Sequence, residues 1–172
     1  METIKPSQNS PIGIFDSGLG GLTVLKSLET ILPNESFIYF GDTAHVPYGT
    51  KSAETVIRYS QHIMDFFQKH ETKAVVIACN TASAVAFQHL QQLYNIPLFD
   101  VVTPSVEFAI NHTKNKNIGV VGTFSTIYSN AYTKMFQKLG SGCNVKEIAC
   151  PLFVPIIEEG WADTEIAENI AK

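Results

Sequence analysis

The sequence predicts an α/β fold built on a doubly wound, flavodoxin-like parallel sheet. Short apolar runs, rich in β-branched and aromatic residues, alternate along the chain with longer stretches of helical period. Runs such as 74–78 (Ala-Val-Val-Ile-Ala) are apolar throughout, which is typical of parallel strands covered by helices on both faces. The composition agrees, because 45% of the residues are hydrophobic and only 16% are charged.

Three strand–helix pairs are expected in residues 1–94. Each strand is a short run of aliphatic and aromatic residues. In each helix apolar residues recur at steps of three and four, and Pro33 and Asn34 mark the end of the first helix. In chain order these elements are strand 12–15, helix 19–31, strand 37–40, helix 53–69, strand 74–78 and helix 81–94.

Strands and helices continue to alternate in the rest of the chain. Pro97 opens the next strand, and Gly140 follows a helix at a position suited to the left-handed conformation of a helix end. In chain order the expected elements are strand 98–102, helix 105–111, strand 118–121, helix 127–139, strand 145–149 and helix 163–171. The last helix has neither a cap nor a strand after it. For a chain of 172 residues we expect two α/β domains, 1–98 and 99–172, the second truncated at its C-terminal end.

Composition and charge exclude several classes of function. The net charge is −4 and no basic cluster occurs, so nucleic acid is not expected as a partner. No apolar run approaches the roughly 20 residues that span a bilayer, and residues 1–10 lack the apolar core of a secretory signal. We therefore expect a cytoplasmic protein that does not contact a membrane.

The cysteines and histidines indicate neither a disulfide framework nor a metal site. The three cysteines are an odd number without zinc-site spacing, and the five histidines are scattered. Cys143 and Cys150 are interpreted as structural residues. No lysine stands out as the Schiff-base partner of pyridoxal phosphate, so no cofactor is expected.

Small polar residues follow several of the expected strands. The carboxyl ends of parallel strands meet at one edge of a sheet, and open α/β sheets bind ligands there. Hydroxyls, an amide, a carboxylate, a thiol and the N–H groups of helix N-termini together suit a small carboxylate ligand. The segments concerned are Asp16-Ser17-Gly18, Pro47-Tyr48-Gly49, Cys79-Asn80-Thr81 and 123–126.

Cys79 and Asp16 are the strongest candidates for chemistry. Cys79 precedes a helix, whose N-terminus is expected to lower the pKa of the thiol from about 8.5 and so produce a reactive thiolate. The alternative is that Cys79 is a small buried apolar residue. Asp16 is a candidate general acid or base beside that thiol, and its alternative role is to cap the helix that follows.

Five segments resemble glutamate racemases, of the aspartate/glutamate racemase superfamily. They are PIGIFDSGLGGLTVLKSL (11–28), FGDTAHVPYGTKS (40–52), VIACNTASAVA (76–86), VVGTFSTIYSNAY (120–132) and ACPLFVPIIEEG (149–160). The resemblance implies a cofactor-independent isomerase that interconverts L- and D-glutamate and supplies D-glutamate for peptidoglycan. It also implies two cysteine thiols on opposite faces of the substrate, and it is compatible with a homodimer.

The resemblance assigns roles to particular residues. Cys79 corresponds to one of the two thiols and Asp16 to its carboxylate assistant. Residues that correspond to substrate-binding positions are Ser17, Pro47, Tyr48, Gly49, Asn80, Thr81, Thr123, Thr126 and Glu158. The second cysteine of the family lies in a Gly-Cys-Thr-His motif, which does not occur in the sequence. The resemblance therefore implies an N-terminal portion of the enzyme that is inactive alone.

Two alternative functions stay open at this point. A single reactive thiol also suits the one-cysteine decarboxylases of the same superfamily, which protonate a planar intermediate from one side. The other alternative is a non-catalytic, glutamate-binding fragment with an unreactive Cys79.

Overall fold

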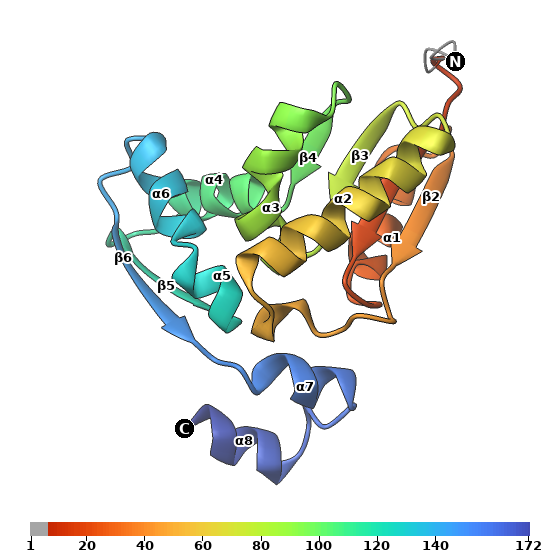
Figure 1. Cartoon of the computed structure of the whole chain (residues 1–172). Helices are drawn as coiled ribbons and strands as arrows, with labels where there is room; N and C mark the ends of the chain where they lie inside the picture. The colour runs from red at the N-terminus through yellow and green to blue at the C-terminus, as the bar shows by residue number, and fades with distance from the viewer. Residues whose placement is uncertain (1–6) are drawn as a thin grey trace.

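Residues 7–172 of the chain are described by a computed structural model, in which each strand is followed by one or two helices (Figure 1). In the first part the elements are β1 (Ile12–Asp16), α1 (Leu22–Ile31), β2 (Phe37–Gly41), the 3-10 turn η1 (Tyr48–Thr50), α2 (Ala53–Lys69), β3 (Ala74–Ile77), α3 (Asn80–Leu93) and β4 (Leu98–Asp100). They are followed by α4 (Val102–His112), β5 (Asn117–Gly122), α5 (Phe124–Tyr128), α6 (Ala131–Lys138), β6 (Asn144–Ala149), α7 (Phe153–Glu158) and α8 (Glu165–Ala171).

The strands form two parallel sheets. The first has the order β2-β1-β3-β4, and the second pairs β5 with β6. The first order is that of flavodoxin-like, doubly wound sheets, so the predicted fold class is confirmed. In Figure 1 the two-stranded sheet lies apart from the four-stranded one, and α7 and α8 lie below both.

The main core lies between the four-stranded sheet and α2 and α3. Because side chains alternate along a strand, Val75 and Ile77 face this core and are completely buried. Phe67 of α2 packs against them in the same cluster. Ala74 and Val76 face the opposite side of the sheet, where α1 lies and where they line a shallow apolar hollow. Figure 1 shows this arrangement, with α2 in front of the sheet and α1 behind it.

The expected helix over 127–139 is wrong, because the chain forms two helices there. Asn130, between α5 and α6, has a φ of 54°, a left-handed conformation that asparagine tolerates better than most residues. α5 begins earlier than expected, after Thr123, whose side chain accepts a hydrogen bond from the N–H of Thr126. α7 is a further helix that the sequence did not predict, and it has Pro155 in its first turn, where a proline is tolerated.

The division into domains 1–98 and 99–172 stays a prediction. The four-stranded sheet extends to Asp100, so the expected boundary falls within β4. A second, smaller core forms where α4 and α6 pack on β5 and β6, around Val102, Val106 and Phe136.

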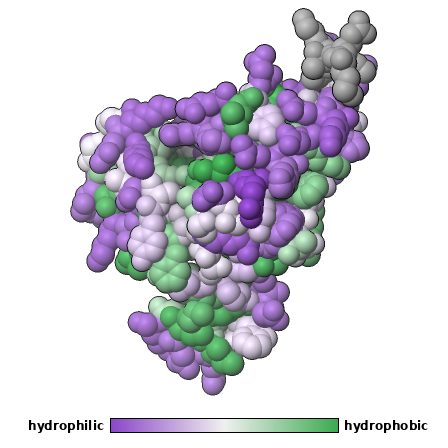
Figure 2. Space-filling view, in the orientation of Figure 1, coloured by the Kyte–Doolittle hydropathy of each residue, from purple (hydrophilic) through white to green (hydrophobic). Residues whose placement is uncertain are grey.

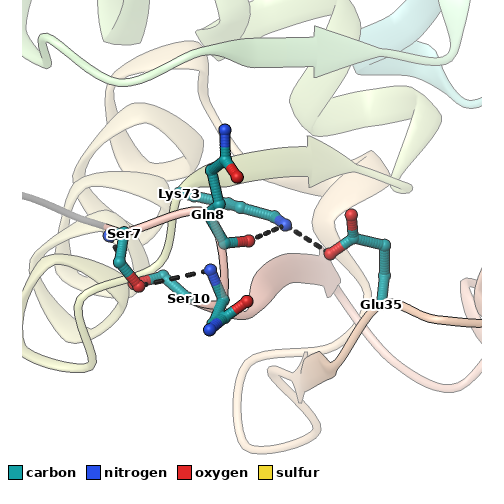
Figure 3. A network of polar contacts seen from close by, with 6 residues as sticks. Ser7, Gln8, Ser10, Glu35 and Lys73 are labelled. Carbon is teal, nitrogen blue, oxygen red and sulfur yellow. Dashed lines mark hydrogen bonds and ion pairs between the residues drawn. The ribbon is translucent and has the colours of Figure 1, made fainter.

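An ion pair lies at the edge of the four-stranded sheet where its strands begin. Ligands are expected at the opposite edge, where the strands end. Lys73, just before β3, donates to Glu35, just before β2, and also to the backbone carbonyl of Gln8 at 2.6 Å (Figure 3). Beside it, the N–H of Ser7 donates to the hydroxyl of Ser10. These contacts tie the segment before β1 to the next two strands of the sheet.

Large apolar side chains are exposed on the surface around α7 and α8. Ile157, Trp161 and Ile166 are each at least half exposed there, and Figure 2 shows the corresponding hydrophobic patch at the lower end of the molecule. Between residues 7 and 172, no helix is both long and apolar enough to cross a membrane. Residues 1–6, on which the expectation about a secretory signal partly depends, lie outside the described residues.

Candidate active site

The sequence-predicted site residues gather around one cavity at the carboxyl edge of the four-stranded sheet. Its volume is about 350 Å³, within the range of pockets that hold small molecules. The segments after β1, β2, β3 and β5 form its walls, together with α7. The predicted residues that line it are Asp16, Ser17, Pro47, Tyr48, Gly49, Cys79, Asn80, Thr81, Thr123 and Glu158.

Cys79 lies at the N-terminus of α3 with its thiol at the cavity wall. Its sulfur accepts a hydrogen bond from the N–H of Ala82 at 3.4 Å and donates to the hydroxyl of Ser17 at 3.6 Å. The expected lowering of the thiol pKa is wrong. Burial raises the pKa of Cys79, and the nearby Asp16 carboxylate raises it further. These two effects outweigh the hydrogen bonds with Ala82 and Ser17, which lower the pKa, so the resting group is a neutral thiol.

Asp16 holds the glycine-rich turn between β1 and α1. One carboxylate oxygen accepts hydrogen bonds from the N–H groups of Gly18 at 3.2 Å and Gly21 at 3.0 Å. A Cβ on Gly21 would lie 2.7 Å from the Cβ of Asp16 and 2.9 Å from that of Ala78, so the turn needs a glycine there. Asp16 therefore orders the loop and also acts electrostatically on the thiol.

Three threonine hydroxyls form a triangle where α3 meets α5. Thr81 lies 3.0 Å from Thr123 and 3.3 Å from Thr126, and the latter two are 3.0 Å apart. Thr126 is 3% exposed and lies behind the cavity wall rather than in it. The structure thus places Thr81 and Thr123 where they can contact a ligand, whereas Thr126 supports them from behind.

Tyr48 and Gly49 form a tight loop against this triangle. The Tyr48 hydroxyl donates to Asp42 at 2.5 Å, and His45 contacts the other oxygen of Asp42 at 2.8 Å. Burial and the Asp42 carboxylate raise the pKa of Tyr48, which keeps its phenol protonated. A Cβ on Gly49 would lie only 2.4 Å from Thr123, so only glycine allows this approach.

α7 closes one side of the cavity and supplies residues that the sequence analysis missed. Val154 and Pro155 line the wall beside Glu158. The Glu158 carboxylate comes close to the turn after β1, since a Cβ on Gly18 would lie 3.6 Å from one of its oxygens. Val154 and Pro155 lie in segment 149–160, which resembles the racemases, but the Pro-Leu-Phe-Val-Pro run has no clear helical or strand period. Gly20, Gly21, Thr23, Val24, Val46, Thr50, Ala78, Val101, Phe124 and Pro151 complete the lining.

The cavity combines hydroxyl and N–H donors with two carboxylates. Within residues 7–172, neither lysine nor arginine lines it, and no group of three His, Cys, Asp or Glu side chains is placed to hold a metal ion. Hydroxyls, the Asn80 amide and backbone N–H groups can bind carboxylate oxygens, while Asp16 and Glu158 can attract an ammonium group. The arrangement is suited to a zwitterionic amino acid beside a thiol.

The chain is similar to known proteins over nearly its whole length. The profile of the family described as Asp/Glu/Hydantoin racemase matches residues 12–172. A glutamate racemase from Geobacter metallireducens is 52% identical over 161 residues, which cover 94% of this chain and 60% of that protein. A glutamate racemase from Chlorobaculum tepidum is 46% identical over 173 residues, covering 100% of this chain and 64% of that protein. The chain thus spans about 60% of the length of these curated relatives.

Solved structures with a similar fold include two glutamate racemases. The enzyme from Francisella tularensis, crystallised in complex with D-glutamate, has a TM-score of 0.89 and 45% sequence identity. The match covers 95% of this chain and 61% of that one. The enzyme from Bacillus anthracis has a TM-score of 0.91 and 38% identity, and the match covers 95% of this chain and 62% of that one.

Proposed function

Because this chain belongs to the Asp/Glu/Hydantoin racemase family, we propose that its cavity binds glutamate and that Cys79 transfers a proton at the α-carbon of this substrate. The observation that carries the proposal is the convergence of Cys79 and Asp16 on one cavity lined by hydroxyl and N–H donors. The D-glutamate complex of the Francisella tularensis relative supports this choice of ligand.

The hydrogen-bond donors of the cavity are suited to stabilise the negative charge that forms during the reaction. Removal of the proton next to a carboxylate moves negative charge onto that carboxylate. Donors that are already oriented stabilise this charge without having to reorganise. Thr81 and Thr123 are held by the hydrogen bond between them, and Asn80 begins the same helix as Thr81. We assign the binding of the substrate carboxylates to these three residues and to Ser17.

Cys79 enters the reaction as a neutral thiol, since burial and Asp16 keep its proton in place. In this state its sulfur donates a proton to the planar carbanion. In the opposite direction Cys79 must first lose that proton, and we assign its acceptance to Asp16, whose charge acts on the thiol. The substrate ammonium near Asp16 and Glu158 favours the thiolate by its positive charge.

Inversion at the α-carbon also requires an acid or base on the opposite face of the substrate. Of the thiols between residues 7 and 172, Cys79 alone lines the cavity. We therefore propose that this 172-residue chain exchanges the α-proton at one face and by itself racemises glutamate negligibly.

The cellular role is proposed on the same basis. As part of a cofactor-independent glutamate racemase, the chain would serve the supply of D-glutamate for peptidoglycan and hence for the cell wall. We place it in the cytoplasm and expect a homodimer, with glutamate and not nucleic acid as its partner, in keeping with a net charge of −4.

Protection of Cys79 from alkylation tests the proposed function directly. The purified chain is treated with iodoacetamide, with and without saturating D- or L-glutamate, and peptide mass spectrometry follows each cysteine separately. We expect glutamate to slow the alkylation of Cys79 while the rates at Cys143 and Cys150, outside the cavity, stay the same.

Two results would contradict the proposal. One is a Cys79 alkylation rate that glutamate leaves unchanged. The other is protection of Cys79 by an arylmalonate but not by glutamate, which would favour the one-cysteine decarboxylase. Glutamate binding without any exchange of the α-proton would instead indicate a non-catalytic binding fragment.

A further inference from the structure

Tyr132 connects a cavity residue to the second sheet. Its hydroxyl, on α6, donates to the side-chain oxygen of Asn80 at 2.6 Å, although the two residues are 52 positions apart. Asn80 lines the cavity next to Cys79, whereas Tyr132 does not. Any effect of Tyr132 on a bound ligand therefore acts through Asn80.

In the structure this hydrogen bond pairs the oxygen end of the Asn80 amide. An asparagine side chain carries an accepting oxygen and a donating NH₂ group. With the oxygen paired to Tyr132, the NH₂ group is the end of the Asn80 amide that is left for a ligand. If the amide turned over, its oxygen would face a bound carboxylate and repel it.

Contacts within the second sheet hold Tyr132 in place. Glu147 on β6 accepts hydrogen bonds from the N–H of Thr133 at 2.8 Å and from its hydroxyl at 2.7 Å, which fixes the first turn of α6. The Tyr132 ring packs on the core that contains Val106 and Phe136. Burial raises the pKa of the Tyr132 phenol, so it stays a hydrogen-bond donor at neutral pH.

We propose that Tyr132 is a positioning residue that keeps Asn80 as a hydrogen-bond donor for a carboxylate group of the substrate. The proposal rests on the proposed function in taking glutamate as the ligand. It adds a dependence of the ligand site on α6 and β6, since Tyr132 is anchored there.

Substitution of the phenol alone tests this role. Tyr132→Phe keeps the ring, and Tyr128→Phe is the matched control, because Tyr128 on α5 is 73% exposed.

Titration calorimetry measures D-glutamate binding by the 172-residue chain, and NMR of the ligand-free chain follows the side-chain amide of Asn80. Both substitutions are repeated in an Asn80→Ala background. The alkylation rate of Cys79 without glutamate and the melting temperature report any general damage.

We expect Tyr132→Phe to weaken glutamate binding about tenfold, the effect of one lost hydrogen bond of about 1.4 kcal/mol. It should also move the Asn80 amide signals and leave the Cys79 alkylation rate unchanged, and Tyr128→Phe should do none of this. In the Asn80→Ala background, Tyr132→Phe should have no further effect on binding.

The positioning role is overturned if Tyr132→Phe leaves the Asn80 amide signals unchanged. It is equally overturned if binding weakens as much in the Asn80→Ala background as in the parent. A parent chain that fails to bind glutamate contradicts the proposed function instead. The amide signals of the ligand-free chain then still decide whether Tyr132 orients Asn80.

Discussion

The thiol of Cys79 donates to the hydroxyl of Ser17 across 3.6 Å, although 62 positions of sequence separate the two residues. The sheet register explains this proximity. β1 and β3 are parallel neighbours, and Phe15 aligns with Ile77, so the residues that follow both strands emerge side by side. Asp16 and Ser17 therefore reach the cavity at the same level as Cys79.

The charge of Asp16 has a measurable effect on the thiol. Because this carboxylate raises the pKa of Cys79, Asp16→Asn should lower that pKa and increase the thiolate fraction at neutral pH. Alkylation of Cys79 by iodoacetamide at pH 7.5 should then be faster than in the parent. Glu158→Gln is the control, since the other cavity carboxylate is not a cause of the shift. An equal or slower rate in Asp16→Asn would contradict this electrostatic assignment.

The same shift predicts how stability depends on pH. The unfolded chain releases the thiol proton near pH 8.5, but the folded chain holds it to higher pH. The resulting stabilisation is complete below pH 8.5 and is lost as the pH rises through the raised pKa of folded Cys79. In urea titrations from pH 7 to 10.5, the free energy of unfolding should fall more steeply for the parent than for Cys79→Ser. Parallel curves would show that the folded thiol has an ordinary pKa.

Gly49 is the position where a single methyl group should disturb the cavity wall most. A Cβ there would lie 2.4 Å from Thr123, so Gly49→Ala should destabilise the fold by about 2 kcal/mol, as overpacking does. Gly119→Ala is the matched control, because nothing lies within 4 Å of its Cβ position. Its free energy of unfolding should change by less than about 0.5 kcal/mol. A Gly49→Ala variant as stable as the parent would mean that the loop does not pack on Thr123.

Much of the fold could be predicted from the sequence, because its strands are buried and its strand ends carry the polar residues. The apolar runs at 12–15 and 74–78 coincide closely with β1 and β3. Because the carboxyl ends of parallel strands lie at the same edge of a sheet, Asp16 and Cys79 could be predicted to lie near each other, and both line the cavity. The break at Asn130 escaped prediction, since asparagine only tolerates a left-handed conformation and does not require one.

The environment of the site could not be predicted in the same way. The pKa of Cys79 depends on how completely other segments cover the thiol, and its burial overrides the helix N-terminus. Likewise, the hydrogen bond from Tyr132 to Asn80 depends on how α6 packs against α3. Neither the pKa of Cys79 nor this hydrogen bond can be predicted from a local sequence pattern, because both arise from contacts between distant parts of the chain.

Exchange of the glutamate α-proton with deuterium oxide is the most direct test that Cys79 transfers this proton. The chain is incubated separately with D- and with L-glutamate in D₂O, and proton NMR follows the α-proton signal of each. We predict a steady loss of this signal for one of the two enantiomers with the parent and with Cys143→Ser, and no loss above background for either enantiomer with Cys79→Ser. Loss at the same rate with Cys79→Ser would contradict the assignment of Cys79 as the residue that moves this proton.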